Sequence, residues 1–181
     1  MYSRDRDYLW WVTSYQLWLA ERAVHAATLH ALTGEAALAD LAERVLEAYA
    51  AQYLEYPNRD NALGPTRPFF STYLESIWLL QLAVALSLLE MAGRARGLGA
   101  RVRERVIAPS AQLIGSFDEG DSNRQVWNAA ALLAAGRLLD DSAVVEQSIL
   151  GPSGLVAHLA RGLLPDGSWY EGENYHVFAH R

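Results

Sequence analysis

The sequence predicts an all-α fold of antiparallel helix hairpins. Apolar residues recur with the three- and four-residue spacing of helices along most of the 181 residues, and no segment alternates as a β-strand would. Segments rich in glycine, proline and asparagine separate these stretches, as is typical of loops between helices. Since 51% of the residues are hydrophobic, the chain can bury a core, and its length fits one domain.

Six helices are expected, in hairpins at about 1–54, 69–116 and 123–163. The first is a long helix from about Asp7 to Thr33, which Gly34 ends. Its tryptophans are interpreted mainly as core and inter-helix packing residues; they are Trp10, Trp11 and Trp18.

The second helix has one apolar stripe and one charged side. The stripe consists of Leu38, Leu41, Val45, Leu46, Tyr49 and Tyr53. On the charged side, the four-residue spacing of Asp40 and Arg44 predicts an ion pair.

The third helix follows a proline-rich loop and is expected from near Phe70 to about Ala92. Thr72 and Glu75 have the spacing of a capping box at its start. The fourth is expected over about 100–115, despite Pro109.

The last two helices frame the most polar loops of the chain. The fifth, about 124–139, is apolar nearly all round, which predicts burial on all sides. The sixth covers about 142–162 and is interrupted at Gly151-Pro152. Residues 177–181 look like the start of a seventh helix, so we expect residues 1–181 to form a single partial domain that is truncated at its C-terminal end.

Composition argues against several classes of partner. The net charge of −6 and the pI of about 5.3 disfavour a nucleic-acid surface. The most apolar stretch is too short to cross a membrane. No signal peptide is evident, so the chain reads as cytoplasmic unless its N-terminus is truncated. There is no cysteine, and the histidine spacing predicts no zinc or other metal site. No cofactor is expected.

Two loops collect polar groups beside apolar helices, where function usually lies. The first is Ser122-Asn-Arg-Gln-Val-Trp-Asn128, and the second is Asp166-Gly-Ser-Trp-Tyr-Glu-Gly-Glu-Asn-Tyr-His176. Asn123 precedes an apolar helix, where asparagine commonly serves as the N-cap, so a capping role is the alternative to a functional one. Asp166 is explained as a turn residue in Pro-Asp-Gly.

With these loops the chain resembles the heparinase II/III-like and alginate lyase group of polysaccharide lyases. The likeness rests on SNRQVWNAAALLAAGRLLDD and GLLPDGSWYEGENYHVFA, and YSRDRDY, LTG and RPFFSTYLESIWLLQLAVAL agree with it. It implies an incomplete (α/α) toroid. It also implies β-elimination on a 4-linked, uronic-acid-containing anionic polysaccharide.

The resemblance also assigns roles to residues. Asn123 would neutralise the C5 carboxylate, and Tyr175 would act as the general acid, or as both acid and base. Substrate contacts are expected from Arg124, Gln125, Glu171, Glu173 and His176. Arg124 stands where many members have histidine, and its planar guanidinium is suited to a carboxylate. A later histidine and a C-terminal β-sandwich are expected to be missing, along with further helices, so the chain alone is expected to be inactive.

Two other functions remain open on the sequence. One is an (α/α)-toroid glycoside hydrolase, for which Asp166, Glu171 and Glu173 would supply carboxylates. The other is a non-catalytic helical interaction module from a truncated gene, whose loops would tolerate changes at Asn123 and Tyr175.

Overall fold

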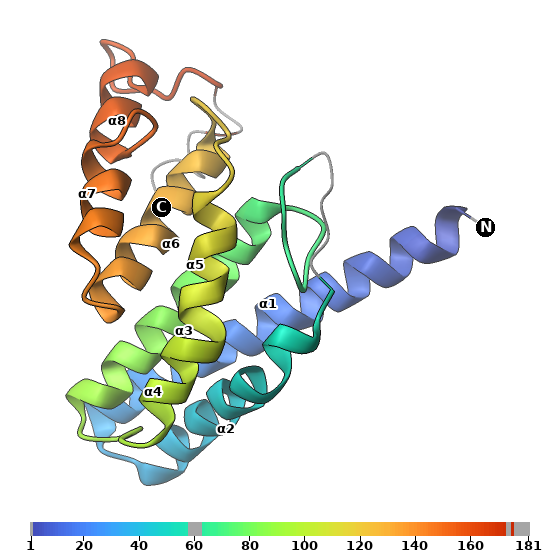
Figure 1. Ribbon diagram of the computed structural model, residues 1–181, viewed down its shortest axis with the longest axis vertical. Coiled ribbons are helices and arrows are strands. Elements are labelled where there is room, and N and C mark those ends of the chain that lie inside the picture. The colour runs from blue at the N-terminus through green and yellow to red at the C-terminus, as the bar shows by residue number, and fades with distance from the viewer. Residues whose placement is uncertain (1, 58–62, 173–174, 176–181) are drawn as a thin grey trace.

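A computed structural model describes residues 2–57, 63–172 and 175, with side chains from Trp10 onward. It is 73% helical, and the described residues form no strand, which confirms the all-α prediction (Figure 1). The elements are α1 (Tyr2–Thr33), α2 (Ala36–Gln52), η1 (Tyr53–Glu55), α3 (Thr72–Met91), α4 (Leu98–Val102), η2 (Arg103–Ile107), α5 (Ala108–Gly115), α6 (Asn123–Leu138), α7 (Ser142–Leu150) and α8 (Leu155–Gly162).

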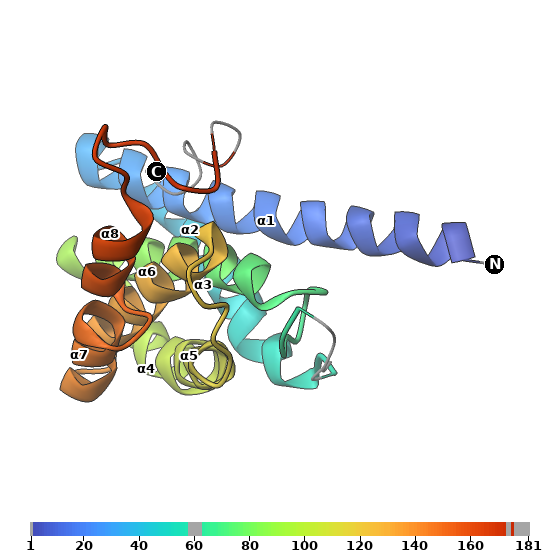
Figure 2. The ribbon, with the colours of Figure 1, turned by 90° about the horizontal axis from the view of Figure 1, so that it is seen from above.

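Helix α3 is the centre of the fold. It packs most extensively against α1 and α6, and α5 also contacts it, so that neighbours surround it in the view from above (Figure 2). Trp78, Leu82 and Leu86 are fully buried. The helix is long and apolar enough to cross a membrane, but 56% of its most apolar window is buried inside the protein. The core helix of a globular fold passes the same test.

Pro109 is accommodated by a local widening of its helix. Residues Arg103–Ile107 form a π-helical turn, in which the Ala108 N–H donates to the Arg103 carbonyl five residues earlier. A proline has no N–H to give and crowds the preceding turn. The wider turn lets α4, η2 and α5 continue as one rod, close to the predicted 100–115.

The side that α2 buries differs from the predicted stripe. Its buried residues include three alanines, Ala39, Ala42 and Ala50, because small side chains allow close packing. Leu41 is instead exposed. The predicted Asp40–Arg44 pair is also wrong, since Arg94 binds Asp40 at 2.5 Å.

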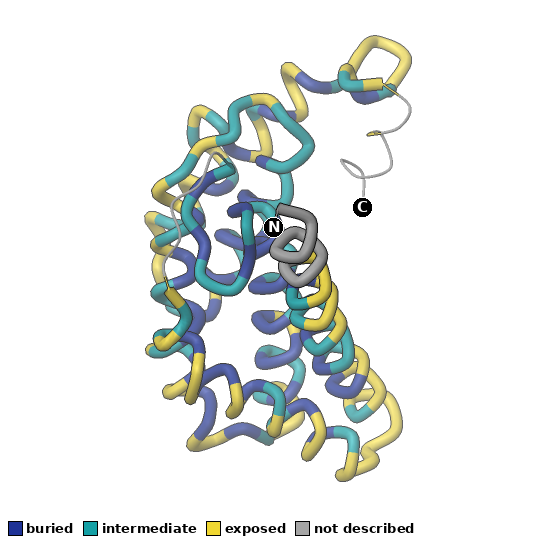
Figure 3. Tube along the Cα trace, turned by 90° about the vertical axis from the view of Figure 1, so that its right-hand side faces the viewer, coloured by how far each residue is buried: buried dark blue, intermediate teal, exposed yellow. Residues whose placement is uncertain are grey.

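Helices α1 and α6 are also less covered than predicted. Trp11 is 78% exposed and Trp18 is 51% exposed, and exposed positions run along one side of α1 in Figure 3. Trp10 packs edge-on against Phe70, with ring centroids 5.1 Å apart. On α6, Val126 and Trp127 are only partly buried, so that helix is not enclosed on all sides.

Glu75 does not form the predicted capping box. Its carboxylate is fully buried and turns inward, away from the start of α3. It accepts hydrogen bonds from the Tyr53 hydroxyl, the Thr66 hydroxyl (2.6 Å), the Arg67 N–H (2.8 Å) and the Ser110 hydroxyl (2.9 Å). The network joins η1, the loop before α3, and α5, because a buried carboxylate requires such donors.

Glu75 gives the fold a specific dependence on pH. Burial raises its pKa above the ordinary value of 4.5, while the hydrogen bonds from Thr66 and Tyr53 oppose the rise. The folded protein therefore holds this proton more tightly than the unfolded chain. The contribution to stability is complete below that ordinary value and is lost as the pH rises through the folded-state pKa.

The variant Glu75→Gln removes this titrating group. We predict that the difference in the free energy of unfolding, wild type minus variant, falls as the pH rises above about 4.5. Urea unfolding at a series of pH values measures this difference. Glu146→Gln, an exposed change on α7, should keep the wild-type slope. A difference that increases with pH would mean that the four donors outweigh burial.

Candidate functional site

The start of α6 depends on a distant residue for its capping. Ser122 is the N-cap, and its own side chain makes no cap hydrogen bond. The Asn123 N–H instead donates to the Glu171 carboxylate at 2.7 Å. The first N–H groups of a helix have no partner within the helix, so a carboxylate there satisfies a donor and interacts favourably with the helix dipole.

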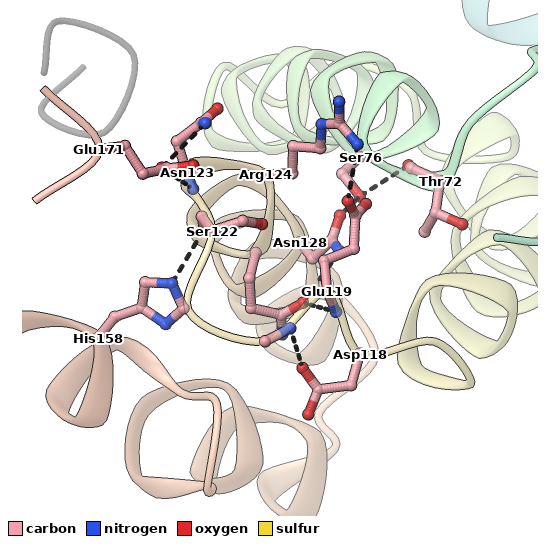
Figure 4. Close-up of polar contacts among 12 residues, drawn as sticks. Thr72, Ser76, Asp118, Glu119, Ser122, Asn123, Arg124, Asn128, His158 and Glu171 are labelled. Atoms are coloured by element: carbon pink, nitrogen blue, oxygen red, sulfur yellow. Dashed lines mark hydrogen bonds and ion pairs between the residues drawn. The ribbon is translucent and has the colours of Figure 1, made fainter. Parts of the chain in front are cut away.

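One oxygen of Glu171 holds both polar loops together. It accepts the Asn123 N–H and also the Asn123 side-chain amide at 3.0 Å. The same oxygen accepts the indole N–H of Trp169 at 2.7 Å. Glu171 thus positions Asn123 (Figure 4), and its contact with substrate stays a prediction.

A second set of contacts braces the same two loops. The buried His158 bonds the Ser122 carbonyl through Nε2 at 3.0 Å and stacks on Trp169 at 5.6 Å. Arg161 donates to Asp121 at 2.7 Å, and the Tyr170 hydroxyl donates to the Asp121 carbonyl. The loop after α8 is therefore fixed against the loop before α6.

Trp169 needs the glycine at the end of α8. A Cβ on Gly162 would lie 2.0 Å from the Trp169 ring, so the indole packs directly on the glycine backbone. The predicted Pro-Asp-Gly turn is confirmed nearby: the Gly167 N–H bonds the Leu164 carbonyl at 2.8 Å, and Asp166 accepts from Ser168. This compact turn orients Trp169 and Glu171.

Arg124 presents an ordered cation at the surface. Its side chain is 40% exposed, lies 3.6 Å from the Glu119 carboxylate and stands over the Tyr73 ring at 5.2 Å. Burial raises the pKa of Tyr73, the Arg124 charge lowers it, and Glu119 and Tyr175 raise it further. Tyr175 is 49% exposed.

Gln125 does not face this surface. It is 7% exposed, and its amide oxygen accepts from the Glu119 N–H and from the Asn128 side chain, both at 3.1 Å. Asn128 in turn accepts from the Ser76 hydroxyl at 2.6 Å. The side chain of Gln125 thus links the loop to α6 and α3 internally, and its contact with substrate stays a prediction.

Tyr73 and Glu119 were not anticipated from the sequence. Tyr73 lies in the stretch 67–86, which carries part of the family resemblance, so the sequence could have pointed to this residue. Glu119 lies in an ordinary acidic loop and gives no such signal. Burial raises the pKa of Glu119, and Arg124 lowers it. Glu173 and His176, also expected to bind substrate, lie outside the described residues.

The acidic residues around the site are largely engaged by other protein groups. Asp118 bonds the Ser153 hydroxyl and the Gly120 N–H, Asp121 is paired with Arg161, and Glu171 holds three donors. Asp141 caps α7. Within the described residues, no three histidine, aspartate or glutamate side chains group as metal ligands would.

Comparison with known proteins gives one relevant likeness. The chain is 28% identical, over 92% of its length, to an alginate lyase of Stenotrophomonas maltophilia (strain K279a). It spans 23% of that enzyme's length. No family model matches the chain.

We predict that Glu171→Ala loosens both loops without unfolding the helices. Hydrogen bonds to a charged acceptor contribute roughly 1.5–3 kcal/mol each, and this carboxylate holds three. Hydrogen exchange should therefore accelerate at least tenfold at the amides of Asn123 and of residues 163–172. Glu146→Ala, an exposed change on α7, should leave those amides protected. Unchanged exchange in Glu171→Ala would show that the contacts of His158, Arg161 and Tyr170 hold the two loops together without Glu171.

Proposed function

We propose that this chain carries part of the active site of a polysaccharide lyase that cleaves 4-linked, uronic-acid-containing polymers by β-elimination. The observation that carries the proposal is the Arg124 guanidinium over the ring of Tyr73 at the start of α6, 5.2 Å from its centroid. The 28% identity to an alginate lyase supports the same chemistry.

The cationic side of this cluster suits the first requirement of the reaction. The C5–H of a uronate becomes acidic only when its carboxylate charge is neutralised. In the proposed complex, Arg124 pairs with the carboxylate through its planar fork, and the side-chain amide of Asn123 donates its remaining N–H. Glu119 and the Tyr73 ring already restrict the guanidinium, so less freedom is lost on binding.

The tyrosines suit the proton transfers. A base removes the C5 proton, the electron pair forms the C4–C5 double bond, and the C4–O4 bond breaks as O4 accepts a proton. In this proposal Tyr175 donates that proton, or serves both steps in turn. Tyr73 stays protonated near neutral pH because burial raises its pKa. It is therefore suited to donate a hydrogen bond and unsuited to act as the base.

The carboxylates favour elimination over the alternative of glycoside hydrolysis. A hydrolase of the usual type needs two carboxyl groups, one on each side of the scissile bond. Among the described residues at this site, Asp118, Asp121 and Glu171 are bound by other protein groups, and Glu119 is paired with Arg124. Formation of an unsaturated, ultraviolet-absorbing product separates elimination from hydrolysis.

We predict that Tyr175→Phe lowers kcat on alginate by about 10²–10³, as expected for the loss of one preorganised catalytic group. Arg124→Gln should mainly raise KM. The assay follows ultraviolet absorbance of the product, using the protein expressed to its natural stop codon. Arg137→Gln, an exposed arginine in the last turn of α6, is the matched control for Arg124. Full activity in Tyr175→Phe would refute the assignment.

We also predict that the 181-residue chain alone shows little or no turnover of alginate. Elimination needs charge neutralisation, a base and an acid held together. Of the described histidines, His158 bonds the Ser122 carbonyl, His25 bonds Arg22 and His30 bonds the Glu35 carbonyl, so each is engaged by another protein group. Product absorbance is measured for residues 1–181 alone and for the protein expressed to its natural stop codon. Equal kcat/KM values would show that residues 1–181 suffice.

A further inference from the structure

We propose that a groove between α1 and α2 is a second binding site for uronic-acid oligosaccharide, separate from the candidate active site. The ligand class rests on the proposed function. In Figure 1 the α2 helix lies at the end of the molecule opposite α8, so the groove is remote from the loop that carries Glu171.

The groove has the size and the lining of a small-molecule site. Its volume is about 410 Å³, within the range of roughly 300–1,000 Å³ typical of ligand pockets. Leu19, Leu41 and Val45 contribute apolar surface to it. Leu41 is 38% exposed, although the sequence pattern predicted that it would be buried in the core.

Hydroxyl and amide groups converge on this apolar surface. Tyr15, Tyr49 and Tyr56 all line the groove. The Tyr49 hydroxyl donates to the Gln16 side chain at 2.6 Å. Gln52 adds a second amide. Such groups pair with sugar hydroxyls, while aromatic faces pack against the C–H faces of pyranose rings.

Aromatic surface continues out of the groove along α1. Tyr15 stacks on Trp18 with ring centroids 6.1 Å apart and planes 19° apart. Arg22 stands over Trp18 at 5.8 Å. Trp18 and Tyr15 are 51% and 58% exposed. A row of exposed aromatic rings is unusual on a protein surface and marks a binding face.

Local charge favours an anionic ligand over a neutral one. The acidic residues nearby on α2 are already paired: Asp40 and Glu43 bind Arg94, and Glu47 binds Arg101. Arg44 lines the groove, and no carboxylate among the described residues pairs with it. An unpaired guanidinium beside aromatic and amide groups is suited to the carboxylate of a uronic acid.

The test is equilibrium binding of a purified 4-linked uronic acid tetramer, prepared from alginate, to the 181-residue chain. Tryptophan fluorescence and calorimetry follow the binding. We expect Arg44→Gln and Tyr15→Ala each to weaken one class of sites at least tenfold. Arg137→Gln serves as the matched arginine control. The double variant Asn123→Ala, Arg124→Gln should leave this class intact. A neutral 4-linked glucose tetramer should bind at least tenfold more weakly.

Three results would overturn the inference. In the first, tetramer binding disappears in the Asn123, Arg124 double variant and is unchanged in Arg44→Gln, so that one site binds all the ligand. In the second, the neutral tetramer binds equally well. In the third, sedimentation shows a dimer that Leu41→Asp dissociates, which means that a second copy of the chain fills the groove.

The inference and the proposed function can fail separately. If the full-length protein forms the unsaturated product and Arg44→Gln binds the tetramer as the wild type does, the second site is refuted and the lyase assignment stands. Loss of tetramer binding in Arg44→Gln, without any unsaturated product from the full-length protein, would keep the binding site and remove the lyase.

Discussion

Burial of α3 is the constraint on which the arrangement of the other helices depends. A twenty-residue helix with eleven buried side chains is stable in water only when neighbours cover most of its surface. Helices α1 and α6 supply the largest share of that cover. Because α6 starts beside the first turn of α3, the packing of the core also brings Arg124 over Tyr73.

The capping of α6 is a second constraint, and the loops satisfy it. The start of α6 needs acceptors, and Ser122 does not provide one from its side chain. The chain provides it 48 residues later through Glu171, and the stacking of His158 on Trp169 stabilises the arrangement. The surface around Asn123 is thereby held by both loops, and a preorganised surface is what binding and catalysis require.

Helix positions followed from the sequence because periodicity and stop signals are local properties. Gly34 ends α1 with a positive φ of 73°, as its position indicated, and Gly93 follows the end of α3 with a φ of 74°. The buried faces were harder to predict. Close helix contacts in α2 use alanine, which hydrophobicity patterns undervalue, so Leu41 was placed on the wrong side.

The candidate site was only partly predictable for a similar reason. Asn123 and Arg124 could be singled out because they begin a helix within a family-like motif. The bracing role of Glu171 and the internal role of Gln125 depend on contacts between segments far apart in sequence. The same holds for Asp40, whose partner is Arg94, 54 residues away, and not the helical neighbour Arg44. Pairings of this kind are fixed by tertiary packing, which local spacing does not encode.

The shared oxygen of Glu171 couples the two loops, so that a change in one affects the other. A change at Asn123 alters what Glu171 holds, and a change at Trp169 alters where Glu171 points. Homologues that vary one loop should therefore vary the other in step. Randomising either segment alone would disturb the other, because both hold the same carboxylate oxygen. The two loops, with the end of α8 between them, are better exchanged between relatives as a single cassette.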